Sequence, residues 1–167
     1  MAPRAASRLE SLGFREVQLY TAGKLDWLAA GLPTDGENST RPRAGTVCHR
    51  DVPTCALTEP VGEVRERVRG AGWDAAVVVD GARVVLGLLR ADDLAKSADA
   101  KVEQAMSSGP STFRPYVPIK EMADYMTQHQ LESSPITTSD GKLVGLLLKS
   151  DAVAQAAGCP DCVRKMI

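Results

Sequence analysis

The sequence predicts a mixed α/β (α+β) protein in which two copies of one β-α-β-β-α unit pack sheet to sheet, preceded by a short helix-strand-helix appendage. Three observations support this fold class. One stretch of the 167-residue chain matches a later stretch without a gap. Helical and strand periodicities alternate in the same order in both stretches. One small sheet with two helices cannot cover its own apolar face, so the unit is expected to occur as a pair.

The internal repeat relates residues 62–95 to residues 120–153, a shift of 58 positions. It preserves the glycine, the aspartate and the apolar positions at helical spacing, and chance agreement at all of them is improbable. Just upstream the spacing changes by one residue, since Pro53 corresponds to Pro110. The matched pairs are Val61 and Ile119, Val64 and Met122, Val68 and Met126, Gly87 and Gly145, and Asp93 and Asp151.

Each copy contains the same five elements. A short extended segment precedes a helix that starts at a proline, where the missing N–H costs nothing. Two apolar strands joined by a Gly-containing turn suit a hairpin. Acidic residues then open the second helix, where they face the positive end of its dipole. These elements are expected at 54–55, from Pro60, at 75–79, at 85–89 and from Ala91, and again at 111–112, from Pro118, at 133–137, at 143–147 and from Lys149.

The composition excludes several classes of protein. A net charge of -1 gives no electrostatic attraction to nucleic acid or to an anionic membrane. No apolar run approaches the roughly 20 residues that a membrane span needs, and the first residues lack the apolar core of a signal peptide. We therefore expect a cytoplasmic protein. Arginine outnumbers lysine and Asn38 is the only asparagine, which suggests a GC-rich bacterial genome.

Residues 45–157 resemble a tandem pair of CBS (cystathionine-β-synthase-type) repeats, the pair often called a Bateman module, with copies at 45–98 and 99–157. The resemblance implies a regulatory module that binds an adenosine nucleotide (AMP, ADP or ATP) or S-adenosylmethionine between the copies, needs no cofactor, and forms a homodimer. It also implies a motif of Gly, two apolar residues, Ser or Thr, two variable residues and Asp. The Asp of this motif accepts hydrogen bonds from the ribose hydroxyls.

Both copies keep the Gly and the Asp of this motif but lack its hydroxyl residue, which is replaced by Arg90 before Asp93 and by Leu148 before Asp151. A guanidinium can hold a phosphate through two parallel hydrogen bonds, whereas leucine offers no donor. The site at Asp93 and Arg90 is therefore the favoured one. The other ligand-binding candidates implied by the resemblance are Thr54, Val78, Ser111, Pro135, Ile136 and Asp151.

The same residues have an explanation without any ligand. Asp93 and Asp151 would then only stabilise helix N-termini, as acidic residues do there. Arg90 would be a solvated charge beside them. On this alternative the pair is a purely dimerising scaffold, and binding of some other kind of ligand is a further alternative.

Residues 1–36 differ in composition from the repeats, and a polar linker at 37–44 separates them. We expect a helix from Arg4, a short strand at 16–20 and a second helix at 22–30, docked with Trp27 buried. This segment resembles the C-terminal end of a rhodanese-like sulfurtransferase domain. The resemblance rests on Pro3-Arg4-Ala5-Ala6, Leu9, Leu12-Gly13-Phe14, Val17, Ala22-Gly23-Lys24, Asp26-Trp27 and Gly31-Leu32-Pro33.

Sulfurtransferase activity does not follow from this resemblance. In that family the nucleophilic cysteine lies just before the segment that matches Pro3-Arg4, so this chain lacks it, and neither Cys48 nor Cys55 precedes a helix N-terminus that would lower its pKa. We therefore predict that the chain is not an enzyme. The alternative is the regulatory part of a rhodanese-like sulfurtransferase whose catalytic half is missing here. Met1 would then be a misplaced start, or the remnant is kept as a packing element.

Residues 158–167 form a C-terminal tail with one C-x-x-C element, Cys159 to Cys162. Alone it supplies two of the four ligands of a structural zinc site. Cys48 and His49 would complete the set, but nothing in the sequence brings them close. No metal site is predicted, and Cys159 and Cys162 stay weak candidates.

Overall fold

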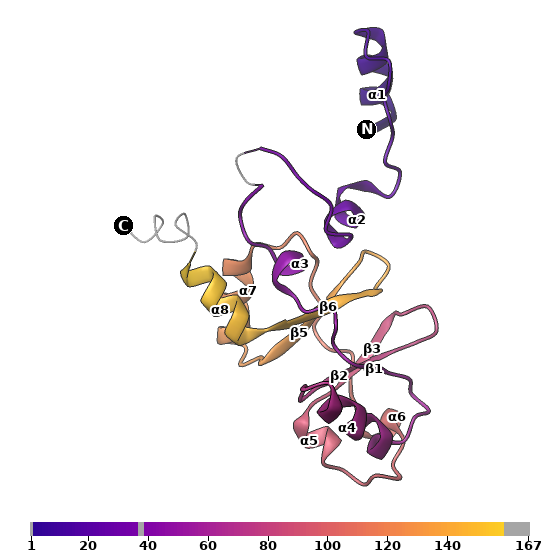
Figure 1. The fold of residues 1–167 in the computed structure, drawn as a ribbon, viewed down its shortest axis with the longest axis vertical. Helices are drawn as coiled ribbons and strands as arrows, with labels where there is room; N and C mark the ends of the chain where they lie inside the picture. Colours follow the sequence, from indigo (N-terminus) through magenta and orange to yellow (C-terminus); the bar gives the residue numbers. More distant parts are fainter. Residues whose placement is uncertain (1, 37–38, 159–167) are drawn as a thin grey trace.

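The structure is a computed structural model that describes residues 2–36 and 39–158. These residues form an N-terminal arm (2–36) and two lobes, each with a small sheet and helices (Figure 1). The arm holds α1 (Ala2–Ser11) and α2 (Gly23–Ala29), and α1 projects away from both lobes. In the described ranges, no helix has the length and apolarity to cross a bilayer.

The first lobe follows the predicted order of elements. It contains β1 (Thr54–Cys55), α4 (Val61–Gly70), β2 (Ala76–Val79), β3 (Val85–Leu89) and α5 (Ala91–Leu94). α4 begins directly after Pro60, and its buried face consists of Val61, Val64 and Val68 at helical spacing. These valines pack with Val78 in the core of the first lobe. The apolar periodicity of the sequence therefore predicted this helix and its buried face correctly.

The second lobe repeats this order with one difference. It contains α7 (Ile119–Gln128), β5 (Ser133–Thr137), β6 (Leu143–Leu148) and α8 (Lys149–Ala157). The extended segment predicted at 111–112 forms no strand; one residue later, Phe113 makes a single parallel bridge to Ile136. Met122 and Met126 of α7 are fully buried, as the helical spacing predicts.

Three short elements absent from the sequence prediction reveal an exchange between the repeats. They are α3 (Ala44–Val47), α6 (Val102–Ala105) and β4 (Ser107–Ser108). α3 contacts α7, α8 and β6 of the second lobe, and His49 after it pairs with Leu146. α6 packs into the first lobe, where β4 completes a sheet in the order β1-β2-β3-β4. Each lobe is thus completed by the segment that precedes the other repeat.

The predicted boundaries at 45–98 and 99–157 therefore differ from the boundaries of the lobes. Ala44, assigned to the linker, is fully buried in the core of the second lobe. Val102, assigned to the second repeat, is fully buried in the core of the first lobe. Because each exchanged helix packs into the core of the opposite repeat, its location depends on tertiary packing and not on local sequence.

The two sheets pack face to face, as predicted. Val77 of β2, Leu88 of β3 and Leu146 of β6 share a core between the lobes, and all three are fully buried. Two backbone hydrogen bonds join the hairpins, from the Leu143 N–H to the Arg83 carbonyl at 2.9 Å and from the Val85 N–H to the Gly141 carbonyl at 3.1 Å. Apolar burial and main-chain pairing together hold the lobes against each other.

Cys48 and Cys55 are buried free thiols. Burial raises the pKa of Cys48, and burial with the nearby Glu59 carboxylate raises the pKa of Cys55 to about 12. Because the thiolate is the reactive form, we expect both thiols of a Cys159→Ser/Cys162→Ser variant to resist an aromatic disulfide reagent until urea unfolds the protein. Fast reaction of either thiol in the folded variant would contradict this expectation.

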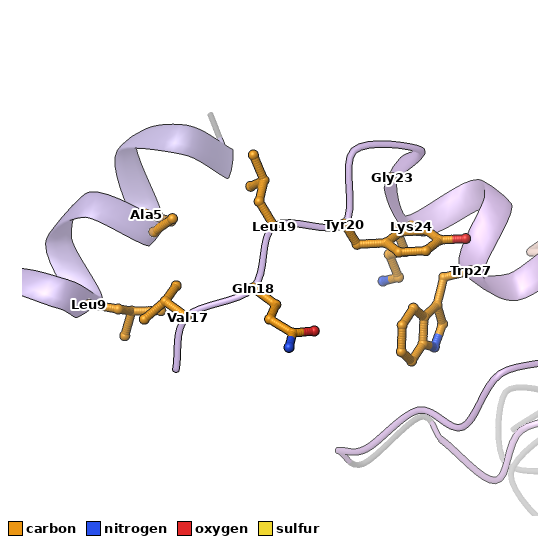
Figure 2. A pocket seen from close by; sticks show the side chains of 10 residues that line it. Ala5, Leu9, Val17, Gln18, Leu19, Tyr20, Gly23, Lys24 and Trp27 are labelled. Carbon is orange, nitrogen blue, oxygen red and sulfur yellow. The ribbon is translucent and has the colours of Figure 1, made fainter. Parts of the chain in front are cut away.

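The arm contains the two predicted helices but not the predicted strand at 16–20. Extended backbone becomes a strand only through hydrogen bonds to a neighbouring strand, and none of the described strands pairs with this segment. Trp27, expected to be buried, is partly exposed; its ring meets Tyr20 edge to face at 5.2 Å, and its Nε1 donates to the Pro33 carbonyl at 2.8 Å. Figure 2 shows both rings beside a shallow hollow of about 410 Å³, together with Ala5, Leu9 and Val17.

The arm is attached to the lobes through α2. Leu28 and Ala29 at the end of this helix are buried, and the Arg50 guanidinium donates to the Ala29 carbonyl at 2.8 Å. Carbonyls in the last turn of a helix lack an intrahelical partner, so this bond satisfies one of them. Arg50 directly follows His49, and the arm is therefore anchored next to the segment that runs between the lobes.

Candidate ligand-binding site

The Asp93 carboxylate is engaged by three donors of the first lobe. It accepts hydrogen bonds from the Arg90 N–H at 3.2 Å, the Lys96 ammonium at 2.8 Å and the Ser107 hydroxyl at 3.4 Å. Its side chain is only 13% exposed. Lys96 also donates to the Ala105 carbonyl at 2.7 Å. The Asp93 carboxylate therefore ties α5 to the exchanged elements α6 and β4.

This environment makes the contribution of Asp93 to stability depend on pH. Burial raises the pKa of Asp93, but the hydrogen bonds and the Lys96 charge outweigh it, so the pKa is lowered. A carboxyl group with a lowered pKa stabilises the fold above its unfolded pKa of about 3.9, and this stabilisation is lost as the pH falls through the folded-state pKa. We expect the difference in unfolding free energy between wild type and Asp93→Asn, measured in urea, to shrink between about pH 6 and about pH 3. A constant difference would show that the charge of Asp93 contributes nothing.

Asp151 occupies the equivalent position in the second lobe but has a different environment. Its Oδ2 hydrogen-bonds to Nε2 of His49 at 2.7 Å, and its Oδ1 has only the Ser150 hydroxyl at 3.5 Å. The Asp151 side chain is 37% exposed. The His49 ring meets Trp73 of the first lobe edge to face, with ring centroids 5.4 Å apart. We call Asp151, His49 and Trp73 the Asp151 cluster; it contains residues of both lobes.

The glycine of each motif lets the exchanged segment lie against the sheet. A Cβ on Gly145 would lie 2.5 Å from the His49 carbonyl oxygen and 2.9 Å from the Cys48 Sγ. A Cβ on Gly87 would collide with the sulfur of Met106. The two motifs therefore act alike, because the Gly accommodates the segment from the other repeat and the Asp hydrogen-bonds to it.

Two segments cross between the lobes and decide which candidate residues meet. Residues 49–54 run from the β6 edge of the second lobe to β1 of the first, and residues 107–113 run from β4 of the first lobe to the β5 edge of the second. Thr54 and Ser107 lie on opposite edges of the four-stranded sheet. Three interstrand steps separate them, which is about 14 Å. Since Ser107 contacts Asp93, the structure does not bring Thr54 and Asp93 together.

The predicted candidates thus divide between two places. Thr54 lies at the end of the crossing segment whose first residue, His49, contacts Asp151. Ser111 lies on the crossing segment whose first residue, Ser107, contacts Asp93. The Ser111 carbonyl accepts a hydrogen bond from the Ser134 hydroxyl of β5. Each place combines the acidic residue of one lobe with a segment leading to the other lobe.

The candidates Val78, Pro135 and Ile136 serve packing through their side chains. Val78 and Ile136 are fully buried among the helices of their own lobes, and neither side chain belongs to the core between the sheets. Pro135 is buried in β5, and its carbonyl accepts the Phe113 N–H at 3.1 Å. Val77, one residue before Val78, faces the second lobe instead.

The residue that replaces the motif hydroxyl lies next to the acidic residue in both lobes. Arg90 and Leu148 precede α5 and α8 at the N-cap, where the side chain neighbours that of the third helical residue, here Asp93 or Asp151. Arg90 is partly exposed, and its guanidinium makes no ion pair with any described residue. Leu148 packs against the core between the sheets. One acidic residue therefore has a cationic neighbour and the other an apolar one.

A surface hollow of about 440 Å³ lies between α4 and α5, with Trp73 and Asp74 in its lining. Trp73 thus borders this hollow as well as contacting His49. The described ranges contain no group of His, Cys, Asp and Glu side chains that could hold a metal ion. Cys159 and Cys162 lie outside the described residues, so the structure does not place the C-x-x-C element.

Sequence reasoning missed His49, Lys96, Ser107 and Trp73 as neighbours of the two acidic residues. The structure makes His49 and Ser107 equivalent, since each contacts the aspartate of the opposite repeat, but the sequence match did not show this because its spacing changes at Pro53 and Pro110. Nothing comparable marks Lys96, whose ammonium reaches Asp93 only through the packing of the lobe.

A protein-family model of the CBS domain matches residues 44–99 and 102–158. The chain therefore belongs to the CBS-domain family, with two domains in tandem. Its first domain begins at Ala44 in this match, where α3 also begins.

Several known proteins are similar to this chain. Inosine-5'-monophosphate dehydrogenase of Korarchaeum cryptofilum (strain OPF8) is 28% identical over 111 residues, which cover 65% of this chain and 23% of that protein. The chain thus spans less than a quarter of that relative and about half of the cytosolic domain of the Mg2+ channel MgtE, solved in complex with ATP (22% identity, TM-score 0.63, covering 68% of this chain and 48% of that one).

Two further structures match over nearly their whole length. CBSX2 in complex with AMP has 18% identity and a TM-score of 0.63, covering 70% of this chain and 97% of its own. The CBS domain pair of protein MJ0100, in complex with 5-methylthioadenosine and S-adenosyl-L-methionine, has 16% identity and a TM-score of 0.63, covering 71% of this chain and 98% of its own. At these identities the likeness concerns the fold.

Proposed function

We propose that this chain is a regulatory module that binds an adenosine-type ligand at the Asp151 cluster. Asp151 accepts hydrogen bonds from the ribose hydroxyls, and Trp73 offers an aromatic surface to the base. The main support for this site is the contrast between the two equivalent carboxylates, Asp93 and Asp151. Asp93 is 13% exposed and has three donors, whereas Asp151 is 37% exposed and keeps one oxygen with only a 3.5 Å contact.

A carboxylate suits ribose recognition because it only accepts hydrogen bonds and has about four lone-pair sites. At Asp151 the His49 imidazole occupies one of these sites and orients the group. The His49 backbone is itself fixed by two hydrogen bonds of 2.9 Å to Leu146, one in each direction. The acceptor is therefore held in place before the ligand arrives, which lowers the entropy cost of binding.

The family relationship supports an adenosine ligand. Structures with the same fold were solved in complex with ATP, with AMP, and with 5-methylthioadenosine and S-adenosyl-L-methionine. The ligands named for these proteins share an adenosine moiety, and the residues proposed here would contact its ribose and base. The substituent at the ribose 5′ carbon differs among them.

The regulatory part of the proposal follows from the two origins of the cluster. Asp151 belongs to the second lobe and Trp73 to the first. A ligand that contacts both stabilises the packing of the lobes in which both contacts are possible. Its effect on that equilibrium equals its difference in affinity for the two arrangements.

Calorimetric titration of AMP, ATP and S-adenosylmethionine tests the proposal. We expect saturable binding of at least one of them, weakened about a hundredfold by Asp151→Asn because one charged acceptor is lost. Asp140→Asn is the matched control, since Asp140 is exposed and pairs with Lys142 in a turn. If none of the three binds at millimolar concentration, the proposal is wrong, and a stable dimer would then favour the dimerising scaffold.

A second site at Asp93, the one favoured by the sequence, is a further candidate. The Lys96 ammonium pairs with that carboxylate, and Arg90 is a second cation at the N-cap of the same helix, a combination that suits a nucleotide phosphate. Loss of nucleotide binding in Asp93→Asn but not in Asp151→Asn would assign the ligand to this second site.

The other sequence predictions stay predictions. We propose a cytoplasmic bacterial homodimer, which sedimentation equilibrium tests for its oligomeric state. The rhodanese-like origin of the arm is supported by α1 and α2 at the expected places and weakened by the missing strand at 16–20. A role as the regulatory part of a sulfurtransferase rests on that resemblance alone.

A further inference from the structure

We infer that the Asp151 cluster selects adenosine ligands whose 5′ substituent is neutral or cationic, such as a thioether or a sulfonium, over nucleotides with a 5′ phosphate. The inference rests on the proposed function, because it names the ligand class of the same site. Two features carry it: the residue beside Asp151 and the balance of charge around it.

The residue beside Asp151 offers nothing to a phosphate. Leu148 is the N-cap of α8 and Asp151 is the third residue of this helix, so their side chains are neighbours. Leu148 has no hydrogen-bond donor, and it packs against the apolar core between the sheets. An apolar substituent such as a thioether methyl group can contact this side chain without losing hydrogen bonds to water, whereas a phosphate there would stay unpaired.

The cations of this region have partners within the protein. Arg65 and Arg69 line the hollow beside Trp73; Arg65 donates to the Leu94 and Lys96 carbonyls, and Arg69 pairs with Glu66 at 3.5 Å. The Lys149 ammonium pairs with the Glu132 carboxylate at 3.2 Å. The Arg50 guanidinium donates to the Ala29 carbonyl of the arm. The positive end of the α8 dipole, which would otherwise favour an anion, is faced by Asp151 itself. A phosphate at this site would therefore have to compete with Glu132 for Lys149, or share Arg50 with the Ala29 carbonyl.

A cationic substituent has two favourable partners here. The Asp151 carboxylate attracts its charge, and the Leu148 side chain contacts its apolar methyl group. The site at Asp93 is the reverse case, since Lys96 pairs with its carboxylate and Arg90 is a second cation at the start of the same helix. The two equivalent positions of the repeat thus differ in the charge of the ligand that they suit.

The test is calorimetric titration of 5′-methylthioadenosine, S-adenosylmethionine and AMP into the wild-type chain, Asp151→Asn and Leu148→Arg, which copies Arg90 into the second lobe. We expect the first two ligands to bind wild type at least about tenfold more tightly than AMP and to lose affinity in Asp151→Asn. Leu148→Arg is expected to reverse the preference. The affinity for S-adenosylmethionine should fall with rising salt, while that for 5′-methylthioadenosine should not.

Two outcomes separate this inference from the proposed function. If AMP binds as tightly as 5′-methylthioadenosine and Asp151→Asn abolishes both, the inference is wrong and the proposed function stands. If no adenosine ligand binds, both are wrong. Leu148 is partly buried, so Leu148→Gln, which adds a donor at similar volume, replaces the arginine variant if that one fails to fold; wild-type selectivity decides the inference in either case.

Discussion

Replacement of Gly145 by alanine is expected to lower the free energy of unfolding by about 3 kcal/mol. The new Cβ would lie 2.5 Å from the His49 carbonyl oxygen, a backbone atom fixed by pairing with Leu146. Neither strand can move away without breaking that pairing. Urea denaturation followed by circular dichroism measures the loss.

The control for this variant is Gly81→Ala. Gly81 lies in the turn of the first hairpin, its φ is not positive, and a Cβ there would meet no atom within 4 Å. We expect its unfolding free energy to stay within about 0.5 kcal/mol of wild type. An equal effect of both substitutions would mean that the close approach of His49 to β6 does not stabilise the protein.

Replacement of Leu146 by alanine is expected to cost about 3 kcal/mol, within the range measured for fully buried leucines. Leu146 is 0% exposed and lies in the core shared by the two sheets, so its removal weakens the contact between the lobes as well as the second lobe itself. Thermal and urea unfolding measure the change.

The matched substitution is Leu12→Ala in the arm, where the side chain is 59% exposed. It removes the same atoms from a position that contributes little burial, and we expect a change below about 0.5 kcal/mol. A small effect of Leu146→Ala would show that the two sheets are not held together by this core.

The contacts of Asp93 and Asp151 explain why a sequence alone does not show whether the motif aspartates bind a ligand. In each lobe the aspartate hydrogen-bonds to the segment contributed by the other repeat, whether or not a ligand binds. A Gly and an Asp at this spacing are therefore explained by the exchange of segments alone. What separates a binding site from a structural contact is the acceptor capacity left over, and by this measure Asp151 exceeds Asp93.

The sequence by itself determined the elements of each repeat. Apolar residues at positions 61, 64 and 68 specify one face of a helix, and Pro60 specifies where it begins. Gly87 and Gly145 marked the second strand of each hairpin. Such local patterns depend only on residues close in the chain, and a repeat doubles the signal. The resemblance of the repeats to CBS domains was confirmed, and the packing of the sheets was predicted correctly.

Only the tertiary structure decided which segments complete each lobe and what surrounds each aspartate. The exchanged helices α3 and α6 are four residues long, too short for a periodicity to be recognised. The strand expected at 16–20 did not form, because a strand needs a partner that the local sequence does not supply. The partners of Asp93 and Asp151 come from the opposite repeat or from a neighbouring turn, and they differ, with Ser107 and Lys96 at one and His49 at the other. Local sequence gave both aspartates the same place in a helix, whereas long-range packing gave them different neighbours and so a different capacity to bind a ligand.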